Sequence, residues 1–451
     1  MGKDRFLEHG KDRDLQRTYR GRAERDPDEV PLPRIGPERA VVISSVQRAD
    51  EDAQDSLTEM GELLRTAGAE VDRTVVQQRP HPDQRAYLGR GKLDEVKELV
   101  ESTKPDLVAV DGELSPRQQR TLEDRLGVRV VDRTAVILDI FALHATTAEG
   151  KLQVELAQLE YSYSRQEGLW QHLERLGGGV GTRGPGETQL ESDRRMLRKR
   201  MGVLRRRLRD LDRSRGVMRE RRLDSGVPRV ALTGYTNAGK SSLMNALSGA
   251  DVEVDDALFE TLDPTTRAIE HHGHRVLLSD TVGFIRALPH QLVEAFRSTL
   301  DEVRDADLVL HVADASEPEH RRLAQATAVE DVLEEIGAGE IPRLRVLNKV
   351  DRLDADQRLA VAAREPEALL TSAVTGEGLE QLRDRLADLA RVRLTAVDVV
   401  IPWADGALLS EVYRQGHEVR EEPTEEGLRV TALLPLAAAA RLRTALRGAG
   451  G

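Results

Sequence analysis

The feature that most constrains this chain is a glycine-rich stretch near its middle, which reads RVALTGYTNAGKSS over residues 229–242. Gly234, Gly239, Lys240 and Ser241 have the GxxxxGK[ST] spacing of a phosphate-binding loop, or P-loop. An apolar run that suits a buried strand precedes the motif, and a run compatible with a helix comes after it. Such a turn lets backbone N–H groups face phosphates, while the lysine adds a positive charge and the serine hydroxyl can bind Mg²⁺. The motif therefore predicts a nucleotide-binding α/β domain.

Length and composition set the broad class of protein. With 451 residues the chain is long enough for about three domains. It has no cysteine, which excludes disulfides and cysteine metal sites and fits a reducing compartment. The first residues are charged and lack the apolar core of a signal peptide. The longest apolar run, residues 430–440, contains Pro435 and is shorter than the ~20 residues of a spanning helix. We expect a cytoplasmic protein without stable membrane insertion.

Charge is distributed unevenly along the chain. The formal net charge is −12, yet residues 194–222 hold fourteen Lys or Arg against Asp210, Asp212 and Glu220, which makes this segment about +11. A solvated helix face explains most charge runs, but stabilised faces of that kind alternate the sign of their charges. The imbalance favours contact with a polyanion such as RNA.

The pattern of apolar, charged and helix-breaking residues predicts a multidomain α/β chain. Its expected parts are a disordered tail (1–37), a small parallel α/β domain (38–133), a helical hairpin arm (134–226) with a glycine-rich tip loop (177–186), the P-loop domain (228–394) and a small α+β module (395–451).

Strands and helices alternate in the first domain, which predicts a parallel sheet. The expected strands are 40–46, 71–77, 107–110 and 128–131, and the expected helices are 55–67, 91–101 and 115–126, the last capped by Ser115. Gly89 and Gly91 could belong to a second phosphate loop, but two glycines without a full motif favour a tight turn before a helix.

The arm is predicted as two long helices, 134–176 and 187–222. The segment between them is predicted as a loop, because its many glycines are unfavourable inside a helix. Helices joined by a short loop form an antiparallel hairpin. Trp170 is expected to pack and His172 to face solvent. The final module is predicted as a strand at 397–401, a helix at 408–415, a hairpin of 417–421 with 428–433, and a helix at 437–446.

Further motifs come after the P-loop in the order that a GTPase requires. Asp280 and Gly283, in the sequence Asp-Thr-Val-Gly, suit a carboxylate that holds Mg²⁺ through water and an N–H that senses the γ-phosphate. Thr261 lies in an expected mobile switch and would be a second protein ligand of Mg²⁺ beside Ser241. The Asp351 carboxylate, in Asn-Lys-Val-Asp, can accept hydrogen bonds from the guanine edge, which adenine cannot donate.

These motifs define the candidate site. The expected catalytic residues are Lys240, Thr261 and Gly283, and the expected metal ligands are Ser241 and Thr261, with Asp280 acting through water. The expected nucleotide-binding residues are Gly234, Tyr235, Thr236, Asn237, Ala238, Gly239, Lys240, Ser241, Phe259, Glu260, Thr261, Leu262, Asp263, Asp280, Thr281, Val282, Gly283, Asn348, Lys349, Val350, Asp351, Ser372, Ala373 and Val374.

One catalytic part is missing. Phe284 comes directly after Gly283, where many Ras-like enzymes have the glutamine that orients the attacking water. Backbone, a partner or an ion must then position this water, so slow intrinsic hydrolysis is expected. Asn237 lies where several GTPases coordinate K⁺, which makes K⁺ a further candidate cofactor beside Mg²⁺.

Taken together, these residues resemble the HflX family of translational GTPases within the Obg-HflX group. The resemblance rests on Tyr87-Leu-Gly-Arg-Gly-Lys92, Leu114-Ser-Pro-Arg-Gln118, Val131-Asp-Arg-Thr134, Leu138-Asp-Ile-Phe-Ala142, Gly150-Lys-Leu-Gln-Val-Glu-Leu-Ala-Gln-Leu159, Gly179-Val-Gly-Thr-Arg-Gly-Pro-Gly-Glu-Thr-Gln-Leu-Glu191, Asp280-Thr-Val-Gly-Phe-Ile285 and Leu288-Pro-His-Gln-Leu-Val-Glu-Ala-Phe296. It implies binding to the large ribosomal subunit and its RNA, with the arm reaching the peptidyl-transferase region. It also implies GTP-dependent splitting of stalled or idle ribosomes, with release after hydrolysis to GDP. We expect a monomer.

The sequence departs from the family pattern at two places. Leu143-His144 stands where Gln-Arg is expected, and Glu260 stands where alanine is usual. Neither is expected to touch a predicted ligand-binding residue, but the first removes a positive charge near the arm, which would weaken RNA contact there.

Two rival functions stay open from the residues alone. One is RNA remodelling driven by ATP as well as GTP, with a second nucleotide site in the first domain. The other is a GTP-switched regulator of a protein partner. The excess of cations over anions in residues 194–222 argues against it, because binding to a protein does not require such an excess.

Overall fold

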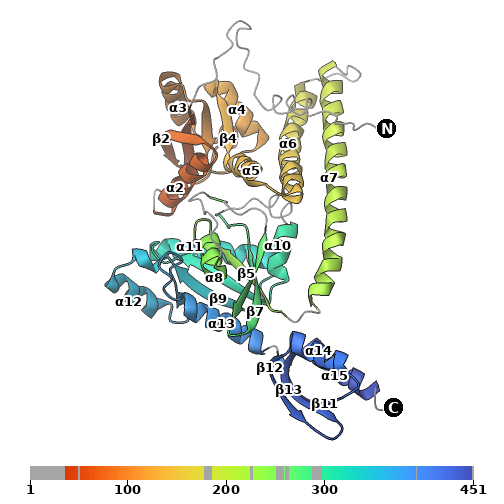
Figure 1. The fold of residues 1–451 in the computed structure, drawn as a ribbon. Coiled ribbons are helices and arrows are strands. Elements are labelled where there is room, and N and C mark those ends of the chain that lie inside the picture. The colour runs from red at the N-terminus through yellow and green to blue at the C-terminus, as the bar shows by residue number, and fades with distance from the viewer. Residues whose placement is uncertain are drawn as a thin grey trace. The chain divides into compact units, whose positions relative to one another are not determined.

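The structure is a computed structural model that describes residues 36–48, 51–176, 185–223, 227–249, 258–259, 264–286, 297–392 and 394–448. The predicted tail up to residue 35 and the tip-loop residues 177–184 lie outside the described residues. Contacts divide the chain into two compact units, Met1–Leu143 with Gln158–Leu197, and His144–Ala157 with Arg198–Gly451. Figure 1 labels the helices and strands of both units.

The first unit contains a parallel sheet, as predicted. Its strands are β1 (Glu38–Val46), β2 (Ala69–Gln78), β3 (Leu107–Val110) and β4 (Arg129–Asp132), in the order β2-β1-β3-β4. The connecting helices are α2 (Glu51–Thr66), α3 (Arg90–Thr103) and α4 (Pro116–Leu126). All four residues of β3 are buried, because helices cover both faces of a parallel sheet.

Local signals explain where two of these helices begin. Ser115 and Gln118 form a reciprocal capping box at the start of α4, with Pro116 in the first turn. The predicted turn before α3 is also confirmed, since the helix begins directly after Gly89. The Gly89 N–H donates to Gln77 Oε1 at 2.8 Å. An added Cβ on Gly89 would lie 2.9 Å from an Arg79 nitrogen.

The arm differs from the prediction at its base. Instead of one helix over 134–176 there are α5 (Arg133–His144) and α6 (Ala148–Leu176). The Thr147 hydroxyl accepts the Gly150 N–H at 2.9 Å, so it caps a new helix and competes with continuation of the old one. Helix α7 (Pro185–Leu223) begins two residues before the expected start, because proline suits the first turn of a helix.

Helices α6 and α7 run antiparallel. Arg194 Nη2 donates to the Tyr163 hydroxyl at 3.0 Å, and Arg200 Nε donates to Glu155 Oε1 at 2.7 Å. Contact positions therefore move forward along α7 as they move back along α6, which is the predicted hairpin arrangement. The packing of Trp170 and the exposure of His172 lie outside the residues whose side chains are described.

The P-loop domain is built on a six-stranded sheet in the order β10-β9-β8-β5-β7-β6. The strands are β5 (Arg229–Gly234), β6 (Thr265–His271), β7 (His274–Asp280), β8 (Leu308–Asp314), β9 (Arg343–Asn348) and β10 (Leu369–Leu370), and only the β6–β7 pairing is antiparallel. The helices are α8 (Lys240–Ser248), α10 (Arg297–Arg304), α11 (Glu319–Glu335), α12 (Ala355–Arg364) and α13 (Leu379–Val392), with a 3₁₀ turn η1 (Val350–Arg352). Apolar residues of α8 and α13 share one core with β5, β7 and β8.

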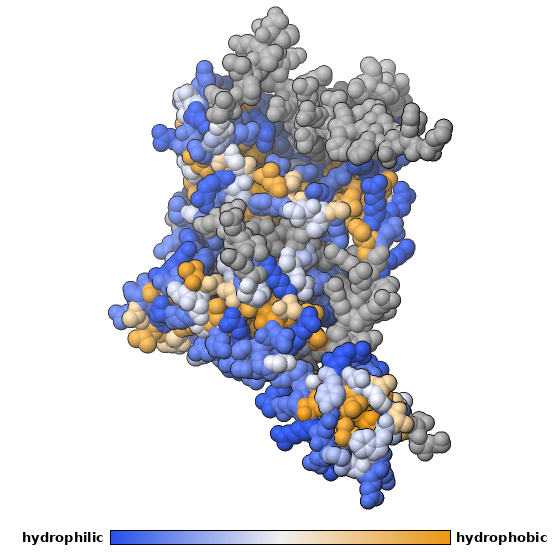
Figure 2. Space-filling view, viewed as in Figure 1, coloured by the Kyte–Doolittle hydropathy of each residue, from blue (hydrophilic) through white to orange (hydrophobic). Residues whose placement is uncertain are grey.

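The C-terminal module is a separate α+β structure, as predicted. Strands β11 (Leu394–Pro402), β12 (His417–Pro423) and β13 (Gly427–Pro435) form an antiparallel sheet in the order β11-β13-β12. Helices α14 (Gly406–Gln415) and α15 (Leu436–Gly448) complete it. Figure 2 shows apolar residues gathered on the visible face of this module. Trp403 and Tyr413 are among its exposed side chains.

A buried carboxylate ties β4 to α6 within the first unit. Asp132 is 1% exposed and forms an ion pair with Arg165. It also accepts the Tyr161 hydroxyl at 2.9 Å and the backbone N–H groups of Ala135 at 3.0 Å and Leu114 at 3.1 Å. Because a buried ion is stable only when such partners satisfy it, the contacts form one interdependent group.

We predict that Asp132→Ala destabilises the first unit by about 3–5 kcal/mol, since it leaves the Arg165 charge and two backbone donors without their acceptor. Asp72→Ala is the matched control, because the Asp72 and Arg39 side chains are 32% and 41% exposed, so loss of this surface pair should cost about 1 kcal/mol or less. Urea unfolding followed by circular dichroism measures both variants. Equal losses would show that the Asp132 group has no special structural role.

Candidate functional site

The candidate site lies at the carboxyl ends of the parallel strands of the P-loop domain. The P-loop comes after β5, the Asp280 to Gly283 segment ends β7, the Asn348 to Asp351 segment ends β9, and residues 371–374 come after β10. Parallel strands that share an orientation bring their carboxyl ends to one edge of the sheet, which is where α/β folds bind ligands.

The shape of the P-loop requires glycine at two positions. Gly234 has φ 152°, and a Cβ there would lie 2.2 Å from the Val312 carbonyl oxygen. Gly239 has φ 85°, and a Cβ there would lie 2.4 Å from Asn348 Nδ2. Both conformation and neighbouring atoms therefore exclude a larger residue.

Lys240 begins α8 and is buried under the loop. Its Nζ donates to the carbonyl oxygens of Tyr235 at 2.9 Å and Gly234 at 3.2 Å. The first N–H groups of α8 add the partial positive charge of a helix N-terminus. The loop therefore offers a cation and the N-terminus of a helix where an anionic phosphate could bind.

Two oxygen donors that could hold Mg²⁺ are already in contact. Ser241 Oγ donates to Asp280 Oδ2 at 2.8 Å. The hydroxyl lies at the start of α8 and the carboxylate at the end of β7, and both are the hard oxygen groups that Mg²⁺ prefers. Thr261 lies outside the described residues, as do Glu260, Leu262 and Asp263.

Phe259 is the first residue of the predicted switch, and it is 2% exposed with φ 58°. Its carbonyl oxygen lies 2.7 Å from His144 Nδ1, so that nitrogen carries the proton and donates it. The expectation that His144 touches no predicted ligand-binding residue is therefore wrong. The two residues are 115 positions apart, which hides the contact from the sequence.

The segment after β7 is hydrogen-bonded to the P-loop. Thr236 N–H donates to the Phe284 carbonyl at 2.7 Å, and Phe284 N–H donates to the Gly234 carbonyl at 3.0 Å. A Cβ on Gly283 would lie 2.9 Å from Thr236 Cγ2 and 3.0 Å from Lys240 Nζ. Gly283 thus lies against Lys240, a placement compatible with the predicted γ-phosphate sensor.

Phe284 itself is fully buried at 0% exposed. Its side chain faces the core and cannot position a water molecule at the site. Thr281 and Val282 are also buried, and the Thr281 hydroxyl donates to the Leu232 carbonyl at 2.6 Å. The Thr281 and Val282 side chains therefore support the segment from the interior.

The base-binding segments meet at Asn348. Its Nδ2 donates to the Ala238 carbonyl at 3.1 Å, and its Oδ1 accepts the Ala373 N–H at 3.2 Å. Asp351 is exposed, and its Oδ1 accepts the Ser372 hydroxyl at 2.5 Å. Val374 is 85% exposed, whereas Val350 is buried beneath the turn. The carboxylate that would read guanine is thus oriented by a serine from the adjacent loop.

One acidic residue of the site was not predicted. Asp314 ends β8, is 7% exposed and pairs with Lys349 Nζ at 2.8 Å. Lys349 Nζ also donates to the Asn237 carbonyl at 2.6 Å. The Asp314–Lys349 pair is therefore hydrogen-bonded to the P-loop next to the expected base-binding segment. The available signal was an acidic residue at the end of the apolar run 308–313, at the same sheet edge as the other motifs.

His311 lies one strand away from the P-loop and stays neutral. Burial, together with the positive charges of Arg345, Arg343 and Lys240, lowers its pKa to about 3. The His311 imidazole therefore adds no positive charge near the P-loop at physiological pH.

Three family models match successive parts of the chain. One described as "GTP-binding GTPase N-terminal" matches residues 54–142, one described as "GTP-binding GTPase Middle Region" matches 144–222, and one described as "50S ribosome-binding GTPase" matches 229–349. A GTPase HflX from Lacrimispora saccharolytica is 43% identical over 399 residues, which cover 88% of this chain and 94% of that protein. The chain belongs to the HflX family of GTPases. The GTPase HflX of Escherichia coli is likewise 43% identical over 398 residues, or 86% of this chain and 92% of that protein.

Among solved structures, a GTP-binding protein from Sulfolobus solfataricus in complex with GDP is 25% identical and covers 78% of this chain and 98% of its own, with a TM-score of 0.41. The family membership makes the protein a GTPase, and the Ser241–Asp280 oxygen pair fits the Mg²⁺ that GTPases use. Within the described residues no helix is both long and apolar enough to cross a membrane.

We predict that Asp351→Asn weakens GTP binding by about 10- to 100-fold, because hydrogen bonds to a charged acceptor contribute about 1.5–3 kcal/mol. The same variant should prefer xanthine nucleotides and still bind ATP poorly, since only the purine edge is read by this residue. Competition against a fluorescent GDP analogue measures these affinities. Asp354→Asn, at the start of α12, is a nearby control that should keep the preference for guanine. Unchanged preference in Asp351→Asn would remove the assignment.

Asp314→Asn should weaken GTP and GDP alike by up to about tenfold, because Lys349 loses a charged partner worth about 1 kcal/mol or more. The ratio of guanine to xanthine affinity should not change, since Asp314 lies behind Lys349 and not at the base edge. The same competition assay tests this, with Asp331→Asn on the exposed face of α11 as the control. A change of base preference would contradict this positioning role.

Proposed function

We propose that this GTPase binds the large ribosomal subunit in its GTP-bound state, splits stalled or idle ribosomes into subunits, and is released after hydrolysis. The candidate residues of the P-loop, the two switches and the base-binding segments would hold GTP, with Ser241 and Thr261 as Mg²⁺ ligands and Asp280 acting through water. The protein would act as a monomer in the cytoplasm, where ribosomes are found.

The charge of α7 is the observation that carries this proposal. Its exposed cations on the part whose side chains are described are Arg195, Arg198, Lys199, Arg200, Arg205, Arg206, Arg207, Arg209 and Arg213. In that part only Asp193 and Asp210 are acidic, and only Asp210 is exposed. A surface with almost only positive charges suits the RNA phosphates of a ribosome better than a protein partner. The match to a model described as a 50S ribosome-binding GTPase supports the same partner.

The antiparallel pairing of α6 and α7 supports a mechanical role for the arm. The pairs Tyr163–Arg194 and Glu155–Arg200 hold the helices together at two levels. A stiff hairpin can transmit force to whatever its connecting segment contacts. Residues 177–184 connect the two helices in the sequence, and the glycines among them would permit close approach to RNA.

The buried Phe284 supports a requirement for outside help in hydrolysis. We propose that the ribosome or a K⁺ ion near Asn237 completes the site. The Asn237 Oδ1 lies 3.4 Å from Lys349 Nζ and is the oxygen that would ligate such an ion. Exchange of Na⁺ for K⁺ should raise the GTPase rate of the unmodified chain but not that of Asn237→Ala. Equal rates in both salts would exclude the ion, and fast turnover without ribosomes would contradict slow intrinsic hydrolysis.

Sedimentation in sucrose gradients tests the function as a whole. With a non-hydrolysable GTP analogue, intact ribosomes should separate into subunits and the protein should travel with the large subunit. With GDP neither effect should occur. Co-sedimentation without splitting would leave a ribosome-binding GTPase and would overturn the splitting activity.

We predict different effects for the stem and the tip of the arm. The triple change of Arg205, Arg206 and Arg207 to Ala should weaken subunit binding and flatten its salt dependence, because each lost phosphate contact removes roughly 0.7 to 0.9 from the slope of log K against log salt. Deletion of residues 177–181 should spare GTP affinity and most subunit binding but abolish splitting. Splitting at the normal rate by the deletion variant would mean that the tip is only a connector.

A further inference from the structure

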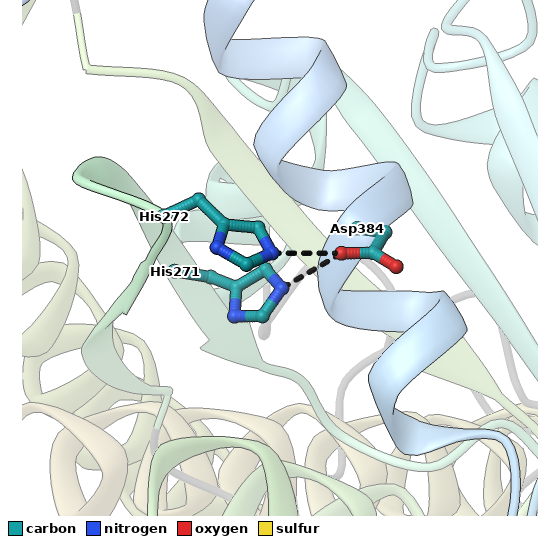
Figure 3. Close-up of side chains that lie close together, drawn as sticks. All are labelled: His271, His272 and Asp384. Atoms are coloured by element: carbon teal, nitrogen blue, oxygen red, sulfur yellow. Dashed lines mark hydrogen bonds and ion pairs between the residues drawn. The ribbon is translucent and has the colours of Figure 1, made fainter.

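A cluster of three metal-ligating side chains lies outside the nucleotide site. It comprises His271 and His272, from the β6–β7 turn, and Asp384, from α13. Their ligand atoms all lie within 4.8 Å of one another. Figure 3 shows both imidazole rings directed at the same carboxylate.

The turn itself brings the two histidines together. His271 pairs with His274 at the end of the β6–β7 ladder, so the loop between the strands is only His272 and Gly273. Both loop residues have positive φ, 49° and 74°, which is the geometry of a tight type I′ hairpin. This turn places the neighbouring rings with centroids 3.9 Å apart, so both can reach one point.

The distances at that point are close to those of a coordination sphere. His271 Nε2 lies 2.8 Å and His272 Nε2 lies 3.4 Å from Asp384 Oδ1. Ligands bound to zinc at about 2.0–2.2 Å in tetrahedral geometry are about 3.3 Å apart. The two distances from the Asp384 oxygen therefore differ from such a spacing by at most about half an ångström, and all three ligand atoms lie within 4.8 Å of one another.

The neighbouring charges favour a cation. Glu380 lies one turn earlier on α13, with Oε1 3.8 Å from His271 Nε2. The Asp384 and His272 side chains are 52% and 70% exposed, which leaves open positions for water.

We propose that His271, His272 and Asp384 form a binding site for a divalent transition-metal ion of the zinc class. Two imidazoles and one carboxylate suit Zn²⁺, Co²⁺ or Ni²⁺, whereas Mg²⁺ prefers oxygen ligands alone. The site is therefore chemically distinct from the Ser241–Asp280 pair. It also lies at the opposite end of β7, about 20 Å away at the rise of a seven-residue strand. The assignment does not depend on the ribosomal function.

Titration of the full-length protein with ZnCl₂, in the presence of GDP and excess Mg²⁺ to saturate the nucleotide site, tests the proposal by calorimetry. We expect one equivalent to bind in the unmodified chain. His271→Ala, His272→Ala and Asp384→Asn should each weaken that binding at least about tenfold, because loss even of a group that only supports a ligand costs about 10- to 100-fold. Substitution of Co²⁺ should give the visible absorption bands of a coordinated ion, and Asp384→Asn should alter them.

Two matched controls make the test specific. Asp388→Asn changes an exposed carboxylate one turn further along α13, and His274→Ala changes the neighbouring histidine, whose ring stacks on His417. Both should keep zinc affinity within about twofold of the unmodified chain. Zinc binding that survives Asp384→Asn, or that falls equally in the two controls, would overturn the three-residue site. Absence of one-equivalent binding would show that the cluster is only a hydrogen-bonded ion pair.

Discussion

The nucleotide site depends on the buried amide of Asn348, because this side chain joins loops that lie at the ends of three different strands. It is 1% exposed and hydrogen-bonds to carbonyls of the P-loop and to the N–H of Ala373. A buried amide without partners would be costly, so the loops are held to one another as well as to their own strands. The same amide explains the glycine at position 239, since a Cβ there would lie only 2.4 Å from Asn348 Nδ2. Two motifs separated by more than a hundred residues are therefore one packing unit.

Positive charge around the P-loop is matched with oxygen atoms that a nucleotide could replace. Lys240 is held by two loop carbonyls, and Lys349 is held by the Asn237 carbonyl and the Asp314 carboxylate. Phosphate oxygens are stronger acceptors than carbonyls, so binding would exchange partners instead of creating a buried charge. Asp314 remains as a fixed counter-charge for Lys349 on the side of the base.

Spacing in the sequence was enough to predict the α/β architecture and the order of the nucleotide motifs, because each motif acts through local backbone geometry. The sequence could not show contacts between distant segments. His144 reaches the Phe259 carbonyl, and Asp314 reaches Lys349, only because the fold brings their elements together. The break before α6 was missed for a different reason. Thr147 is only a weak helix former and does not by itself end a helix, but its hydroxyl caps the first turn of α6. The assignments of individual nucleotide ligands stay predictions, since they concern a bound state.

The β6–β7 hairpin connects the two candidate cation sites within the P-loop domain. At one end Thr265 pairs with Asp280, the expected Mg²⁺ partner, and at the other His271 pairs with His274 beside the histidine turn. The pairing runs between these ends without a shift of register, so the strands are a stiff antiparallel ribbon. A slip of one residue in the pairing would turn every side chain of one strand to the opposite face of the sheet. Because Ile269, Val276 and Leu278 would then lose their buried positions, such a slip is unfavourable. A metal ion that holds the turn against α13 would add to that constraint. The position of Asp280 would then depend on both the sheet that carries it and the far end of its own hairpin.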